Sequence, residues 1–173
     1  LVNASVSVPS PTPTPSPTPS PSPPHIPTFV RRIDLPANNI VLSNATQALY
    51  ASVPSSAGSN GNSITKIVPE TGQVGPSTFV GSEPNKLAIS ADGQTLYVHL
   101  NGANAMRRFD VVSATPGLQF PTSSQPPADM EVLPGSPQSI AVSRGNFGGI
   151  AIYDDAIQRT NTGNNFTSIG PIE

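Results

Sequence analysis

The stretch that decides the fold runs from Pro84 to Val98 and reads Pro-Asn-Lys-Leu-Ala-Ile-Ser-Ala-Asp-Gly-Gln-Thr-Leu-Tyr-Val. Two apolar segments flank Asp92-Gly93, which is a typical two-residue hairpin turn because Gly tolerates positive φ and Asp can bond to its own backbone. The stretch therefore predicts two antiparallel strands joined by a tight turn.

The same strand-and-turn unit occurs twice more, at residues 40–51 and 137–153. A shift of 47 positions carries Ser43 onto Ser90 and Tyr50 onto Tyr97, and Ser143 follows Ser90 by 53. These spacings are close to the roughly 40 to 50 residues of one β-propeller blade. The repeat favours propeller blades over a single sandwich or an α/β domain.

A third strand is expected in each unit, after a loop that contains Gly or Asn. The segments with the matching rhythm of apolar and polar residues are 30–34, 64–68, 106–110 and 157–160. The chain is thus expected to open inside one blade, run through two and enter another.

The run from Gly81 to Asp110, with Leu87-Ala88-Ile89-Ser90, Asp92-Gly93 and Tyr97-Val98, resembles the YVTN-type β-propeller repeats of bacterial and archaeal cell-surface proteins. The resemblance covers about residues 28–161. It implies a propeller fold, but such relatives include surface-layer proteins, binding modules and lactonases, and fold alone does not select among them.

The predicted fold is all-β, with about three antiparallel propeller-like blades in residues 28–173. Closed propellers have roughly four to eight blades, so an incomplete or open propeller is expected. Two interpretations stay open: the chain is a fragment, or it assembles with copies of itself through unpaired strand edges.

Residues 9–27 are predicted to form an extended polyproline II stalk. Ten of the 22 prolines lie before residue 28, and no charged side chain precedes Arg31. Proline fixes φ and removes amide hydrogens, which favours polyproline II. Alternating Ser or Thr with Pro is also typical of O-glycosylated stalks. The candidate acceptors are Ser10, Thr12, Thr14, Ser16, Thr18, Ser20 and Ser22.

Residues 1–8 alternate apolar and polar side chains in the manner of one isolated strand. One interpretation is that they end a preceding domain. The other is that they are donated to the open sheet edge of a neighbouring subunit. The side chains of such an exchanged strand would be Leu1, Val2, Ala4, Val6 and Val8.

The predicted location is extracellular or at the cell surface, from the stalk and the family resemblance. Sequons at Asn3, Asn44 and Asn165 are candidate N-glycosylation sites. The chain has no cysteine, so its composition does not define a redox compartment. No apolar run reaches the roughly 18 residues of a membrane span, and no signal peptide is recognised.

Charge argues against nucleic acid as a partner. Only 10% of the residues are charged and the net charge is -2, which leaves no basic stripe for a phosphate backbone. The basic pairs Arg31-Arg32 and Arg107-Arg108 are expected on solvated strand faces, near Asp34 and Asp110.

No catalytic, cofactor or metal site is predicted. His25 and His99 have no third ligand at zinc-like spacing. The best acidic group joins Asp154-Asp155 to Asp129 and Glu131 in the preceding loop, too few oxygens for the roughly six to eight that Ca²⁺ takes. We therefore expect no cofactor.

The alternation predicts a core between the blades. Its expected members are Ile40, Leu42, Leu49, Leu87, Ile89, Leu96, Val98, Ile140, Val142, Ile150 and Ile152, with Ile33, Ile67 and Phe109 on outer strands. Two functions are compatible with these observations. The first is a non-catalytic extracellular structural or interaction glycoprotein that forms a homo-oligomer or polymer. The alternative is a fragment of a propeller lactonase or hydrolase, or of a ligand-binding propeller, whose site lies in absent blades.

Overall fold

The computed structural model describes residues 31–122, 125–144 and 149–160. The chain divides into two units, residues 1–30 and residues 31–173, and all the described residues belong to the second. The expected N-terminal strand, the stalk, His25 and the candidate glycosylation sites in residues 1–30 lie outside the described residues.

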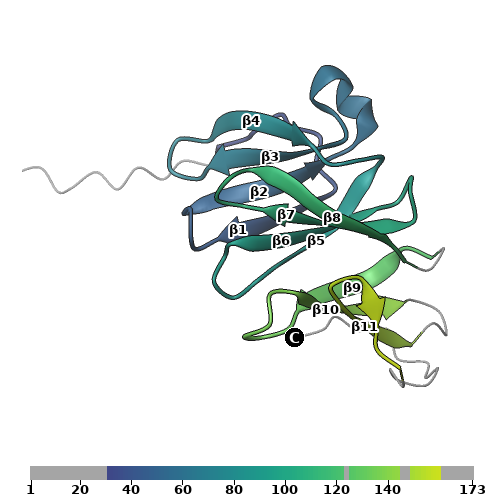
Figure 1. Cartoon of the computed structure of the whole chain (residues 1–173). Coiled ribbons are helices and arrows are strands. Elements are labelled where there is room, and N and C mark those ends of the chain that lie inside the picture. Colours follow the sequence, from purple (N-terminus) through teal and green to yellow (C-terminus); the bar gives the residue numbers. More distant parts are fainter. Residues whose placement is uncertain (1–30, 123–124, 145–148, 161–173) are drawn as a thin grey trace, which may run out of the picture. The chain divides into compact units, whose positions relative to one another are not determined.

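Three four-stranded antiparallel sheets make up the described part of the second unit (Figure 1). The first blade contains β1 (Asn39–Ser43), β2 (Ala48–Val53), β3 (Ser63–Val68) and β4 (Gln73–Phe79), with the 3-10 helix η1 (Ser55–Asn60) between β2 and β3. The second contains β5 (Pro84–Ile89), β6 (Thr95–Leu100), β7 (Ala105–Asp110) and β8 (Thr115–Pro121). The third contains β9 (Pro127–Val132), β10 (Ser139–Arg144), β11 (Ile150–Asp154) and β12 (Ile157–Gln158). The all-β, blade-like architecture is confirmed.

The β5–β6 hairpin forms around Asp92-Gly93, but its loop is longer than the predicted two-residue turn, because Ile89 and Leu96 are the last paired residues of the strands. The Gly93 amide donates to the Ser90 carbonyl at 2.8 Å, and the Ser90 amide donates to the Thr95 carbonyl at 2.8 Å. The Asp92 carboxylate accepts from the amide of Gln94 at 3.0 Å. These bonds satisfy the backbone groups of the turn, which the strand ladder leaves without partners.

The first blade repeats the register of the second at the predicted shift. Val41 pairs with Tyr50 and Leu42 with Leu49 in β1 and β2, while Ala88 pairs with Tyr97 and Ile89 with Leu96 in β5 and β6. Two of the three copies are therefore aligned as the sequence indicates.

The third copy is shifted by one strand from the predicted alignment. Residues 137–143 and 150–153 belong mainly to β10 and β11, the second and third strands of the blade, and β9 is its first strand. β9 contacts β5 as β5 contacts β1. The Leu133 amide donates to the Ser139 carbonyl at 3.0 Å, as Ser90 does to Thr95, so Ser139 corresponds to Thr95.

The physical reason for this error lies in β9 and in the turn that follows it. β9 carries Asp129 and Glu131 in place of an apolar run, and the next turn contains Gly135 in place of an Asp-Gly pair. The apolar alternation of β10 resembles that of β5, so the pattern places the copy one strand late. Asp129 and Glu131 lie in a strand, not in a loop.

Residues 31–34 form no strand, contrary to the expectation for residues 30–34. Ile33 and Leu35 instead pack against the first blade, in a cluster with Ala51, Val53 and Ile67. The segment has no partner strand, and a strand needs one to satisfy its backbone. In the described chain the first blade therefore begins at β1.

The core lies between the blades. One cluster joins the first and second blades and includes Tyr50, Ile64, Leu96 and Phe109. A second cluster joins the second and third blades and includes Tyr97, Met106, Ile140 and Tyr153.

The predicted core is correct in its centre and wrong at its two ends. The buried members are Leu87, Leu96, Val98, Ile140, Val142, Phe109 and Ile67. The partly buried members are Leu49, Ile89, Ile152 and Ile33. Ile40, Leu42 and Ile150 are exposed. The reason is positional, because no further described blade covers the sheet faces on which they lie.

Candidate interaction surface

Each blade has two faces, since successive side chains of a strand point to opposite sides. We call the face toward the preceding blade the leading face and the face toward the following blade the trailing face. In the second blade the leading face carries Leu87, Leu96, Val98 and Phe109, which pack with the first blade. Its trailing face carries Ala88, Tyr97, Met106 and Phe120, which pack with the third blade.

The leading face of the first blade is open where the same face of the other blades is closed. Ile40, Leu87 and Met130 occupy equivalent positions by strand register. Their relative exposures are 57% for Ile40, 6% for Leu87 and 3% for Met130. The three positions have the same apolar character, so the exposure of Ile40 reflects the lack of a preceding blade among the described residues.

The trailing face of the third blade is open in the same way. Ile64, Met106 and Ile150 are equivalent, because each pairs with the fifth residue of the second strand of its blade. Ile64 is 2% and Met106 0% exposed, whereas Ile150 is 48% exposed. Ile157 of β12 pairs with Asp154 of β11, which places it on this same face, and Ile157 is also exposed.

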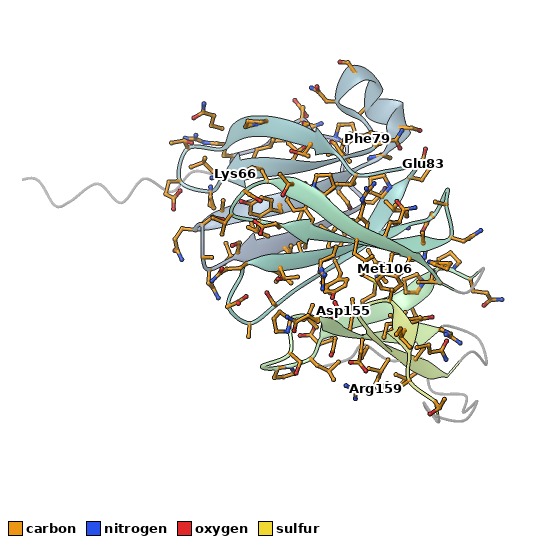
Figure 2. All side chains as sticks on the ribbon, in the orientation of Figure 1. Lys66, Phe79, Glu83, Met106, Asp155 and Arg159 are labelled. Atoms are coloured by element: carbon orange, nitrogen blue, oxygen red, sulfur yellow. The ribbon has the colours of Figure 1, made fainter. Side chains whose placement is uncertain are left out.

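A short segment covers part of the leading face of the first blade. Ile33 and Leu35, with Ala57 of η1, pack over the middle strands β2 and β3. Ile40 and Leu42 of β1 stay open, as does Val74 of β4. Phe79 of β4, labelled in Figure 2, is also exposed. The register places all four open side chains on one face, since Ile40 pairs with Ala51, Ile67 with Val74 and Ser63 with Phe79.

Hydrogen bonds also link one blade to the next. The Tyr50 hydroxyl donates to the Val111 carbonyl at 3.4 Å, and the equivalent Tyr97 donates to the Pro137 carbonyl at 3.1 Å. Burial raises the pKa of Tyr97. In the third blade the equivalent residue is Ala141, so its trailing face has no tyrosine for such a bond.

The trailing face of the third blade is acidic as well as apolar. Glu131 stands where the other blades have Val41 and Ala88. Burial, and then the charge of Asp129, raise the pKa of Glu131. At this position of the first strand, the two covered trailing faces carry the uncharged residues Val41 and Ala88. The open trailing face of the third blade differs from them by its carboxylate.

The basic pairs differ in part from the prediction. Arg32 pairs with Asp34 at 2.8 Å, as expected. Arg108, however, pairs with Asp155 of the third blade at 2.7 Å and not with Asp110. Figure 2 labels Asp155. Burial alone would lower the pKa of Arg108, but hydrogen bonds with Asp155 and Tyr97 raise it.

Arg107 also departs from the expected solvated face. Its guanidinium donates to the Val80 carbonyl at 3.1 Å, and its Nε is buried without a hydrogen-bond partner. Asp110 instead accepts from the Ser113 amide at 2.7 Å, and this bond lowers the pKa of Asp110. The two arginines thus contribute to the junctions between blades.

The acids and the described histidine are used within the fold. Asp154 accepts from Arg159 at 2.6 Å and from Ser139 at 2.5 Å, and these bonds lower its pKa to about 2. His99 is buried between Asn101, at 2.8 Å, and Thr122, at 3.3 Å. Burial lowers the pKa of His99. Within residues 31–122, 125–144 and 149–160, no three His, Asp or Glu side chains are placed to hold a metal ion.

Two pockets lie between blades. One, of about 220 Å³, is lined by Ser90, Asp92, Leu133, Ser136 and Pro137. Its carboxylate, Asp92, is held by the Ser90 hydroxyl and the Gln94 amide, which lower its pKa. The other, of about 130 Å³, lies between Tyr50, Lys66 and Val111. Neither pocket brings together an acid and a base in the way that general acid–base catalysis needs.

Asn44 is the one candidate glycosylation site that the described residues contain, and it is exposed in the turn between β1 and β2. Thr46 of this sequon contacts the Tyr50 hydroxyl at 3.1 Å. Asn3, Asn165, the Ser and Thr acceptors of the predicted stalk and the strand-exchange side chains Leu1, Val2, Ala4, Val6 and Val8 lie outside the described residues. No helix in the described part of the chain is long and apolar enough for a membrane span.

These features define a set of β-propeller blades with two open end faces, and similar structures support that class. The chain is similar to Kuenenia stuttgartiensis hydrazine synthase, with 17% identity, a TM-score of 0.58 and coverage of 80% of this chain and 40% of that one. The RRP9 WD40 repeats give 14% identity, a TM-score of 0.58 and coverages of 82% and 42%. The streptogramin B lyase gives 17% identity, a TM-score of 0.52 and coverage of 75% of this chain and 40% of that one.

The likeness extends to the fold alone. The chain spans about 40% of the length of these solved structures. No protein-family description and no curated protein sequence matches it. The neighbours include a synthase, a lyase and a WD40 repeat protein, so they select no single activity.

Proposed function

We propose that this protein is a non-catalytic extracellular module of the YVTN type, which acts through association of its propeller-like blades. The observation that carries the proposal is the pair of open end faces. Ile40 and Ile150 are 57% and 48% exposed at positions that are closed in the adjoining blades. Exposed apolar sheet faces of this kind mark interaction sites in proteins.

The polar groups of the described residues support a structural role. The ion pair of Arg108 with Asp155 and the hydroxyls of Tyr50 and Tyr97 join one blade to the next. Asp154 and His99 are likewise bonded inside the fold. We infer that these groups serve blade packing and that the protein works by binding, as a homo-oligomer or polymer.

The extracellular and glycoprotein parts of the proposal rest on sequence. Residues 9–24 alternate proline with serine or threonine, a composition typical of O-glycosylated stalks. Asn44 supplies an exposed sequon. Mass spectrometry of the native protein before and after deglycosylation checks this part, with occupied Ser, Thr or Asn44 expected and an unmodified chain as the contrary result.

Carbene footprinting of the full chain at increasing protein concentration tests the interaction role. Labelling of Ile40, Leu42, Ile150 and Ile157 is expected to fall as the chains associate. Val112 is the control, because it is 65% exposed but lies in the loop between β7 and β8. Labelling of the end faces that does not change with concentration would contradict a role in self-association.

A further inference from the structure

The two junctions inside the chain show what covers each kind of blade face. At both junctions a trailing face packs against a leading face: Tyr50 and Ile64 lie against Leu96 and Phe109, and Tyr97 and Met106 lie against Ile140 and Tyr153. The first and third described blades each have one face of the kind that forms such a junction but no described blade against it. In the described residues, the leading face of the first blade is covered only in its middle, by Ile33, Leu35 and Ala57, and the trailing face of the third blade is open.

We propose that the open trailing face of the third blade docks on the open leading face of the first blade of a second copy of this chain. The inference rests on the proposed function and specifies its partner and direction. On one side are Ile150, Ile152 and Ile157. On the other are Ile40 and Leu42, with Ile33 and Leu35 contributing to the receiving surface.

Charge favours this direction over pairing of like faces. The trailing face of the third blade carries Asp129 and Glu131 in β9, so two such faces would bring four carboxylates together. Like charges opposed across an interface weaken binding. The segment over the leading face of the first blade carries Arg31, Arg32 and Asp34, of which Arg32 and Asp34 form an ion pair, so its net charge is positive. A head-to-tail contact therefore brings acidic and basic groups together.

Symmetry gives this contact a distinctive consequence. A head-to-tail contact closes a ring when its rotation permits and otherwise builds an open filament. Two copies of the described three sheets would supply six blades, within the roughly four to eight of closed propellers. The ring and the filament use the same two faces. A substitution that blocks one face therefore prevents head-to-tail contacts between all chains that carry it.

The experiment compares Ile40→Asp, which blocks the leading face, with Ile150→Asp, which blocks the trailing face, both in the full chain. Both residues are exposed, so a charge there is compatible with folding, and circular dichroism checks this. Val112→Asp is the matched control, because Val112 is exposed away from both faces. Analytical ultracentrifugation measures the association of each variant.

Wild type and Val112→Asp are expected to sediment at twice the 17.8 kDa chain mass or more. Each blocked variant alone is expected to associate about 100-fold more weakly or worse, since an unpaired carboxylate would be buried. A mixture of the two is expected to restore one species of two chains, because the unblocked faces of the variants are complementary.

Three results would overturn the proposal. If Ile40→Asp or Ile150→Asp alone associates like wild type, pairing is between like faces or uses another surface. If the mixture of blocked variants stays monomeric while wild type associates, the two faces are not complementary. If wild type itself stays monomeric at every concentration, the proposed function fails together with this inference, whereas the first two results remove this inference alone.

Discussion

At the residue scale, Gly93 combines backbone conformation with close packing between blades. Its φ is +72°, and a Cβ at this position would lie 2.7 Å from the Ala45 nitrogen and 2.9 Å from the Asn44 nitrogen. Its carbonyl accepts from the buried Ser43 hydroxyl at 2.7 Å. The Asp-Gly pair thus forms the hairpin and also allows the turn of the first blade to approach the second.

Gly93→Ala is expected to destabilise the protein through both effects. The left-handed backbone costs about 1 to 2 kcal/mol for a residue with a side chain, and the overlap with backbone nitrogen atoms adds about 1 to 3 kcal/mol. Gly135→Ala is the matched control, since Gly135 also has φ +72° but has no atom within 4 Å of the new Cβ. Urea unfolding measures the difference, and equal losses would show that the blade contact does not matter at Gly93.

Exposure at the ends of the blade series could not be predicted from the residues themselves. Ile40 and Ile150 have the same alternation as Leu87 and Val142, so the pattern indicates burial for all four. Alternation shows which side chains share a face, but it does not show whether another sheet covers that face. The open end faces, which carry the proposed function, therefore came from the arrangement of the blades.

At the element scale, the first three strands of the first two blades were predictable, whereas their fourth strands, β4 and β8, and the alignment of the third blade were not. The register of β1 with β2 repeats that of β5 with β6 at the predicted shift. In the third blade, β9 has a buried face of Met130 and Val132 and an opposite face with Asp129 and Glu131. Charged residues and the prolines around this segment obscure its four-residue alternation, so the sequence predicts a loop there.

Met130→Ala tests the assignment of β9 as the first strand of the third blade. Met130 is buried in the cluster that joins the second and third blades, so its truncation is expected to cost about 2 to 5 kcal/mol. Val112→Ala, at an exposed loop position, should change the free energy of unfolding by less than about 0.5 kcal/mol. Tolerance of Met130→Ala in urea unfolding would favour a loop at residues 127–132.

At the scale of the whole described unit, stability is distributed over two junctions of similar construction. The first cluster joins the first and second blades and the second cluster joins the second and third. No cluster contains buried residues of all three blades, so the second blade is the link between the other two. Repeat architectures with nearest-neighbour contacts lose their units locally when one junction is weakened.

Hydrogen exchange on Ile140→Ala and Ile64→Ala is expected to separate the two junctions. Ile140 is buried at the second junction and Ile64 at the first, and each truncation should cost about 2 to 5 kcal/mol. The energy of local opening depends on the contacts of the opening segment. Ile140→Ala should therefore speed exchange in β9, β10 and β11 more than in β1, β2 and β3, and Ile64→Ala should produce the reverse pattern. The paired design controls for overall stability, because both variants remove the same atoms from an isoleucine. Equal acceleration in all three sheets would mean that the blades open as one cooperative unit, in which case docking of a second copy would stabilise the whole unit and not only its two end blades.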